Sequence, residues 1–178
     1  MRSIMPGMSS SRFPPVVDDV TVRLIAAIVL AISVVALGAQ QWWLYAVLAA
    51  DFILRTAVGP RASPIAQLVT RWIRPAVPAA KRPTAGAPKR FAATIGAVLT
   101  VAATALWLAN VITGSSTAIS VVVVIGVVMV LFPLLEAAFG LCVGCRLFAA
   151  LMRLGLVPEE VCLDCADITR RREPHPAR

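Results

Sequence analysis

The sequence predicts an all-α integral membrane protein with four transmembrane helices, and three observations indicate this class. Of the 178 residues, 59% are hydrophobic and only 15% are charged, whereas soluble domains are roughly 45–50% apolar and about 25% charged. The mean hydropathy is +0.84. Finally, if four apolar segments cross a bilayer and both termini lie on the same side, all the lysines and arginines fall on that side. The positive-inside rule then predicts cytoplasmic N- and C-termini.

The four predicted spans are long apolar runs. They cover residues 20–37, 42–58, 91–112 and 118–135. At 1.5 Å per residue, the first run reaches about 27 Å, close to the hydrocarbon thickness of a bilayer. Because the runs lack the alternation of barrel strands, and only helices and closed barrels satisfy the backbone in lipid, we expect helices. We therefore predict a multi-pass protein of the cell membrane.

The connections between these spans differ in charge. The two outer turns carry no charge, whereas the loop of residues 59–90 is basic. Within it, Ile65, Leu68, Val69 and Trp72 recur at helical spacing, which predicts an amphipathic helix at the inner membrane surface. Prolines from Pro75 onward predict an extended, flexible linker.

The chain therefore divides into four parts. Residues 1–19 form a cytoplasmic N-terminal segment, residues 20–135 the transmembrane domain, residues 136–169 a short helical segment with the cysteines, and residues 170–178 a basic tail.

The net charge of +8 would suggest nucleic acid in a soluble protein. Here the cations lie beside apolar runs and are not interleaved with aromatic residues, so we expect the bilayer as partner and no nucleic acid. Small residues such as Ala92 and Gly96 allow close helix contact within one chain or between copies, which leaves a homo-oligomer open.

Four ionisable residues lie at the inner ends of the predicted spans. Asp51 and Arg55 are four residues apart on one helix face, which predicts an ion pair that orients the second helix; a proton or ion relay is the alternative. Glu136 follows the fourth span and Pro133. We expect it to be an interfacial carboxylate partnered by an arginine of the central loop, with proton acceptance from nearby thiols as the alternative. Arg23 is expected to extend to the cytoplasmic headgroups.

The four cysteines form two C-x2-C pairs, Cys142 with Cys145 and Cys162 with Cys165. On the cytoplasmic side permanent disulfides are rare, so catalytic or metal-binding thiols are expected instead. Gly140 and Gly155 predict the limits of a helix that begins near Cys142. A thiol at such a helix N-terminus, beside Arg146, would carry more thiolate.

Three interpretations of the cysteines stay open. The first is a thiol redox or sulfur-relay protein in which Cys142 attacks, Cys145 resolves, and Cys162 and Cys165 pass electrons or sulfur on. The second is a structural or regulatory zinc site formed by all four thiolates, because the spacing fits a tetracysteine site. In the third, the cysteines are simply packed and reduced. A small transporter or channel subunit, based on Asp51 and Glu136, is a further alternative. No nucleotide-binding motif or Ser-His-Asp set predicts a particular enzyme class.

Several motifs resemble those of a known family. The chain contains R-x3-GPR-x-SP at residues 55–64, PKRFA at 88–92, FG-x-C-x-GC at 139–145 and VC-x2-CAD at 161–167. Over about residues 14–171 it resembles the bacterial membrane family called domain of unknown function 4395. The resemblance implies an integral membrane protein without an established activity. It also favours a thioredoxin-like or sulfurtransferase partner, because genes for thioredoxin-like proteins and sulfurtransferases often lie near genes of this family.

Overall fold

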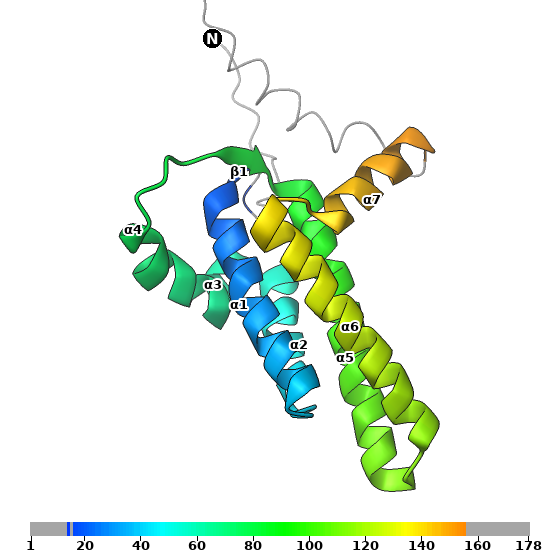
Figure 1. The fold of residues 1–178 in the computed structure, drawn as a ribbon. Coiled ribbons are helices and arrows are strands. Elements are labelled where there is room, and N and C mark those ends of the chain that lie inside the picture. The colour runs from blue at the N-terminus through cyan, green and yellow to red at the C-terminus, as the bar shows by residue number, and fades with distance from the viewer. Residues whose placement is uncertain (1–13, 15, 156–178) are drawn as a thin grey trace, which may run out of the picture.

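The computed structural model describes Pro14 and residues 16–155, which form mostly helices (Figure 1). Three helices are long and apolar enough to cross a membrane: α1 (Asp19–Gly38), α5 (Gly86–Thr113) and α6 (Ser116–Phe139). Their most apolar windows have mean hydropathies of 2.6, 2.0 and 3.0. These helices contain the first, third and fourth predicted spans, and each extends beyond the predicted limits.

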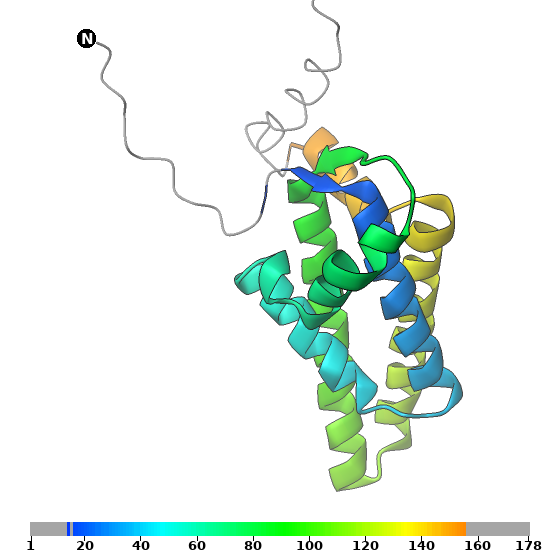
Figure 2. The same ribbon diagram turned by 90° about the vertical axis from the view of Figure 1, so that its left-hand side faces the viewer.

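The second predicted span corresponds to α2 (Leu44–Ala57), which has only 14 residues. At 1.5 Å per residue this helix is about 21 Å long, shorter than the hydrocarbon core of a bilayer. Helix α2 packs mainly along α5, whereas α1 packs along α6 and α5 contacts α6 (Figures 1 and 2). The residues 42–58 are therefore helical and packed in the bundle, but α2 is not long enough by itself to be a typical span.

A short antiparallel strand pair joins the beginnings of α1 and α5. Strand β1 (Val16–Asp18) pairs with β2 (Pro83–Ala85). Asp18 binds Arg74 at 2.7 Å, the Arg82 backbone N–H at 2.9 Å and the Thr21 hydroxyl at 2.9 Å. Burial raises the pKa of Asp18, but these hydrogen bonds outweigh it and lower the pKa to about 2. The segment predicted to be a flexible linker is thus fixed at both ends: Arg74 binds Asp18, and β2 pairs with β1.

The amphipathic helix expected in the central loop is present, but its apolar residues divide between two faces. It comprises the 3₁₀ turn η1 (Pro60–Ala62), α3 (Pro64–Leu68), the π-helical turn η2 (Val69–Ile73) and α4 (Arg74–Ala76). Ile65 and Val69 are buried, whereas Leu68 is exposed and Trp72 is 74% exposed. One face therefore packs on the bundle, and the other offers large apolar side chains for the membrane interface.

Close helix contacts rely on glycine. A Cβ at Gly96 would lie 2.8 Å from the ring of Phe52, and one at Gly126 would lie 2.5 Å from the Tyr45 hydroxyl oxygen. In α7 (Val143–Arg153), a Cβ at Gly144 would lie 2.5 Å from the Cβ of Ala92 on α5. Ala92 and Gly96, which could have supported contact between copies, are thus both used inside the chain.

We predict that Gly144→Ala displaces α7 from α5, because the added methyl group overlaps the Ala92 backbone as well as its side chain. Overpacking of this kind costs about 1–3 kcal/mol. The thermal unfolding temperature in detergent should fall, and Cys142 should react faster with a small thiol reagent. Gly38→Ala is the matched control, because a Cβ added at Gly38 would meet no atom within 4 Å; equal effects of both variants would contradict the contact.

Candidate functional site

The candidate site lies where α6 ends and α7 begins, at the end of the bundle that also holds β1 and β2 (Figure 1). Gly140 adopts a left-handed conformation with φ 68°, and its N–H donates to the Glu136 carbonyl at 3.0 Å, which ends α6. Cys142 is then the N-cap residue of α7. The predicted helix break and the position of Cys142 near a helix start are both confirmed.

A lysine and two carboxylates from three helices meet beside this break. The Lys89 Nζ lies 2.7 Å from Glu136 Oε1 and 3.8 Å from Asp19 Oδ1. Glu136 is therefore paired, but with a lysine and not with the arginine expected from the sequence. Lys89 lies in the first turn of α5 and Glu136 in the last turn of α6, where each charge opposes the helix dipole. Their mutual contact offsets this unfavourable placement, and local conflicts of this kind are typical of functional sites.

Sequence reasoning did not select Lys89 as a site residue. It was one of several cations in the basic loop, and nothing in the spacing distinguishes it from its neighbour Arg90. The only available signal was its position in the PKRFA motif, directly before an apolar run. The fold separates the two residues: Lys89 is largely buried against α6, whereas Arg90 is exposed.

The two described thiols have opposite electrostatic environments. Cys142 is 8% exposed and Cys145 is partly exposed. A hydrogen bond from the Cys145 thiol lowers the pKa of Cys142, and nearby Lys89 adds to this, against the opposing effects of burial and Glu136. The same hydrogen bond, together with burial, raises the pKa of Cys145. The surroundings of the pair therefore favour the thiolate of Cys142 over that of Cys145.

The sequence spacing places Leu147, Leu151 and Leu154 on one face of α7, but this is not the face that packs on α5. Leu147 and Leu154 are exposed and Leu151 is half-buried. The buried residues are Gly144 and Phe148, and the Phe148 ring lies 5.5 Å from the ring of Phe91 on α5. Arg146, expected beside the thiol, is also exposed, so Lys89 is the cation that acts on Cys142.

A large cavity extends from this site into the bundle. It has a volume of about 540 Å³, and its wall includes Cys142, Lys89 and Glu136. Deeper in the bundle the wall is formed mainly by apolar side chains of α1, α5 and α6. The buried thiol therefore faces an apolar space between the helices.

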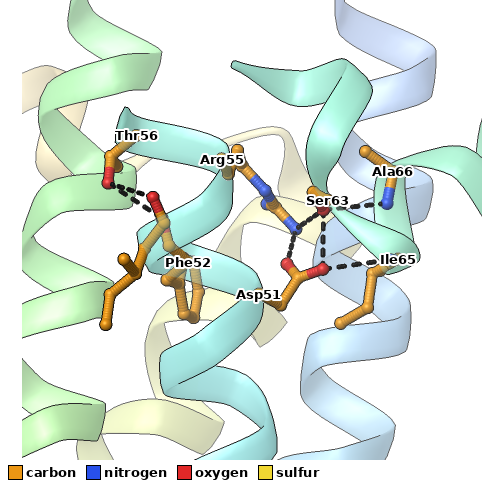
Figure 3. A network of polar contacts seen from close by, with 8 residues as sticks. Asp51, Phe52, Arg55, Thr56, Ser63, Ile65 and Ala66 are labelled. Carbon is orange, nitrogen blue, oxygen red and sulfur yellow. Dashed lines mark hydrogen bonds and ion pairs between the residues drawn. The ribbon is translucent and has the colours of Figure 1, made fainter. Parts of the chain in front are cut away.

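The second group of predicted site residues forms a separate buried network around Asp51, which is 2% exposed (Figure 3). Asp51 Oδ2 pairs with Arg55 at 2.5 Å, and Asp51 Oδ1 accepts from the Ser63 hydroxyl at 2.6 Å and from the Ile65 N–H at 3.0 Å. The Ser63 oxygen in turn accepts from the Ala66 N–H at 3.1 Å, as an N-cap of α3. The Asp51 carboxylate thus joins α2 to α3. These contacts are the ones expected of an ion pair that orients α2.

Arg23 does not extend away from the protein. Its guanidinium donates to the carbonyl oxygens of Ala137 at 3.1 Å and Ala138 at 3.0 Å. These carbonyls lie in the last turn of α6, where backbone acceptors lack helical partners and a cation is favourable. Arg23 thus holds α1 against the end of α6.

The proposed tetracysteine zinc set is only partly visible. Cys162 and Cys165, like the basic tail 170–178, lie outside the described residues. Among residues 14 and 16–155, no three histidine, cysteine or acidic side chains gather closely enough to hold a metal ion.

The fold and the site define a helical protein with three candidate membrane spans and a dithiol at one end of its bundle. Its residues 17–153 match the family model described as domain of unknown function (DUF4395). Because this match covers most of the chain, the protein belongs to that family. Comparison with curated proteins and with solved structures found no match.

We predict opposite effects of the two buried charges on Cys142. Lys89→Met removes the cation that lowers the pKa of Cys142 and leaves the opposing effect of Glu136, so the pH midpoint of thiol alkylation should rise. Glu136→Gln should lower that midpoint. The measurement is the rate of reaction with methyl methanethiosulfonate against pH, in a chain whose other three cysteines are serine.

Arg90→Gln is the matched control, since it removes the adjacent but exposed cation. Its pH midpoint should equal that of the parent. A shift of the same sign in the Lys89 and Glu136 variants would contradict the electrostatic origin of the thiolate.

Proposed function

We propose that this protein is a membrane-embedded thiol redox protein that exchanges electrons with a soluble protein partner through Cys142 and Cys145. One observation carries the proposal: Cys142 is the N-cap residue of α7 and lies in the same cavity wall as Lys89, and Cys145 follows it in the first turn of that helix. Low-pKa thiols at helix N-termini in C-x-x-C motifs are typical of disulfide exchange.

The exchange uses the different exposure of the two sulfurs. In the oxidised chain, a partner thiolate attacks the more accessible Cys145 sulfur, the Cys142–Cys145 bond breaks, and its electron pair leaves on Cys142 as the stabilised thiolate. The partner's second thiolate then attacks the partner's first sulfur, which is bonded to Cys145 in the mixed disulfide. This displaces Cys145, which takes up a proton. The partner is oxidised to a disulfide and the chain is reduced to its dithiol. Cys142 is the better leaving group because its pKa is the lower of the two.

The proposed partner is a thioredoxin-like protein or a sulfurtransferase on the cytoplasmic side. Such proteins present a reactive sulfur to a thiolate, and the partly exposed Cys145 with the exposed Arg146 offers them an accessible, basic helix start. A partner persulfide would react with the reduced chain instead. The Cys142 thiolate attacks the outer sulfur, the S–S bond of the partner breaks with its electron pair leaving on the partner's thiolate, and the persulfide then stands on Cys142. Cys162 and Cys165 are the proposed second pair in this relay.

We also propose four membrane crossings, with both termini in the cytoplasm and the cell membrane as the location. The pairing of β1 with β2 supports an even number of crossings between them, because it holds the beginnings of α1 and α5 at one end of the bundle. Helix α2 is the segment that returns the chain after α1. Trp43 directly precedes α2 and Trp72 follows it in the central loop, and both are exposed. In the proposed topology Trp43 lies at the outer membrane–water interface and Trp72 at the inner one.

The topology predicts different labelling of two exposed positions. In a chain with all four cysteines replaced by serine, Gln41→Cys should react with a membrane-impermeant maleimide added to intact cells, because residue 41 lies in the outer turn. Lys81→Cys should react only after the cells are opened. Both side chains are exposed, so unequal accessibility within the protein does not explain the difference. Labelling of Lys81→Cys from outside would invert the proposed orientation.

The dithiol predicts the products of oxidation. With Cys162→Ser and Cys165→Ser in place, oxidised glutathione should convert the chain to an internal disulfide without retaining glutathione. A further Cys145→Ser substitution removes the thiol that displaces glutathione, so the reaction should stop at a stable mixed disulfide on Cys142. Intact-mass measurement distinguishes the two products.

The outcome that supports a zinc site instead is equally clear. The full chain purified in detergent would contain one tightly bound Zn²⁺ per molecule, and replacing any single cysteine would release it. That result, together with no reaction of Cys142 with oxidised glutathione, would overturn the redox proposal.

A further inference from the structure

The cavity described above has the size and the polarity of a ligand site. Its volume of about 540 Å³ falls within the roughly 300–1,000 Å³ typical of small-molecule sites. The walls between the helices carry Ile25, Val29, Leu99 and Met129. Phe132 and Leu147 also line it and are exposed, so the lining continues to the surface of the bundle. A molecule with an apolar tail could therefore enter from the lipid.

Polar residues are a minority of the cavity wall, and Thr70 of η2 is one of them. Lys89, Glu136 and Cys142 contribute to its wall near α7, and Asp18 and Thr21 lie near the strand pair. Arg55 also contributes, but its charge is already paired with Asp51. A ligand would thus meet a hydrogen-bond donor, an acceptor and a nucleophilic sulfur at the Cys142 end, and mainly apolar surface elsewhere.

Building on the dithiol function proposed above, we propose that this cavity binds a membrane-soluble quinone, with its ring beside Cys142 and Lys89 and its apolar tail between α1, α5 and α6. The quinone is the electron acceptor that reoxidises the Cys142–Cys145 dithiol. The chain would then pass electrons from a soluble thiol partner to the quinone pool of the membrane.

The burial of Cys142 favours this class of oxidant. Since Cys142 contributes to the wall of a mainly apolar cavity and is 8% exposed, an acceptor that approaches through the cavity must dissolve in lipid. It must also take two electrons and two protons from a dithiol. A quinone meets both requirements, and the ammonium group of Lys89 can donate a hydrogen bond to the ring oxygen on which negative charge develops.

The proposed step balances in electrons and protons. The Cys142 thiolate forms an S–C bond with a ring carbon of the quinone. The Cys145 sulfur then attacks Cys142 Sγ, the S–C bond breaks, and its electron pair stays on the ring. One S–S bond is formed in place of the Cys142 thiolate and the Cys145 S–H bond. The ring takes up the Cys145 proton and the proton that Cys142 released on ionisation, and becomes the hydroquinone. Glu136, which contacts Lys89 at 2.7 Å, is the nearest carboxylate for proton transfer.

The test uses the reduced full chain with Cys162→Ser and Cys165→Ser, reconstituted in lipid nanodiscs, and decylubiquinone as the acceptor. We expect one quinone to be reduced per chain, seen by its absorbance, with formation of one internal disulfide, seen by intact mass. Ala93→Phe places a ring in the cavity wall at a buried position of α5. Quinone reduction should then slow about tenfold or more, the effect expected from overpacking a close-packed wall.

Two controls separate the cavity from the fold. Ala105→Phe introduces the same ring at an exposed position of the same helix and should reduce quinone at the parent rate. In every variant, internal disulfide formation by oxidised glutathione should be unchanged, because that reagent approaches from water. If Ala93→Phe does not fold, Ala26→Leu fills the cavity from α1. In the parent chain, decylubiquinol, which cannot oxidise thiols, should also slow alkylation of Cys142.

The outcomes distinguish this inference from the function on which it rests. If glutathione forms the disulfide but decylubiquinone does not, or if cavity filling leaves the quinone rate unchanged, the quinone proposal is overturned and a lipid chain becomes the occupant. If neither oxidant forms the Cys142–Cys145 disulfide, the dithiol function fails as well.

Discussion

The contact between Lys89 and Glu136 is the interaction on which the arrangement of the site depends. It joins the beginning of α5 to the end of α6, at a point where Asp19 of α1 is also near. Each charge opposes the dipole of its own helix, and without Glu136 the lysine would keep only the longer contact with Asp19 at 3.8 Å. The pair holds α5 to α6 and places a cation that helps to lower the pKa of Cys142. Packing and thiol chemistry therefore share one pair of side chains.

The sequence was a good guide where the signal is local. Long apolar runs predicted α1, α5 and α6, and Gly140 with Gly155 predicted the limits of α7, because a left-handed residue after a helix is a property of a few neighbouring positions. The pairing of Asp51 with Arg55 followed from their spacing alone. The predicted limits of α5 were too short because Gly86, Pro88 and Lys89 look like loop residues, although proline and glycine are tolerated in the first turn of a helix.

What could not be predicted is what depends on contact between distant segments. Lys89 and Glu136 are 47 positions apart in the chain, and no pattern in either neighbourhood selects one lysine among the basic residues. The packing face of α7 was wrong for a similar reason: its leucines outnumber its glycines as apolar candidates, but the close approach of Ala92 admits only the face with Gly144. Helix α2, by contrast, follows its predicted limits closely: it begins two residues later and ends one residue earlier than the run 42–58.

The position of Arg23 changes how the net charge of the protein should be understood. Its guanidinium is occupied by the last carbonyls of α6, and Arg55, Arg74 and Lys89 are likewise held by carboxylates of the chain. These four cations contribute little to the field that anionic phospholipids experience at the surface. Attraction to the leaflet falls instead to exposed residues such as Arg61, Arg71, Lys81 and Arg90. The carboxylates that hold Arg55, Arg74 and Lys89 are already subtracted in the net charge of +8. Ionic strength should therefore act mainly on exposed cations such as Arg61 and Arg90.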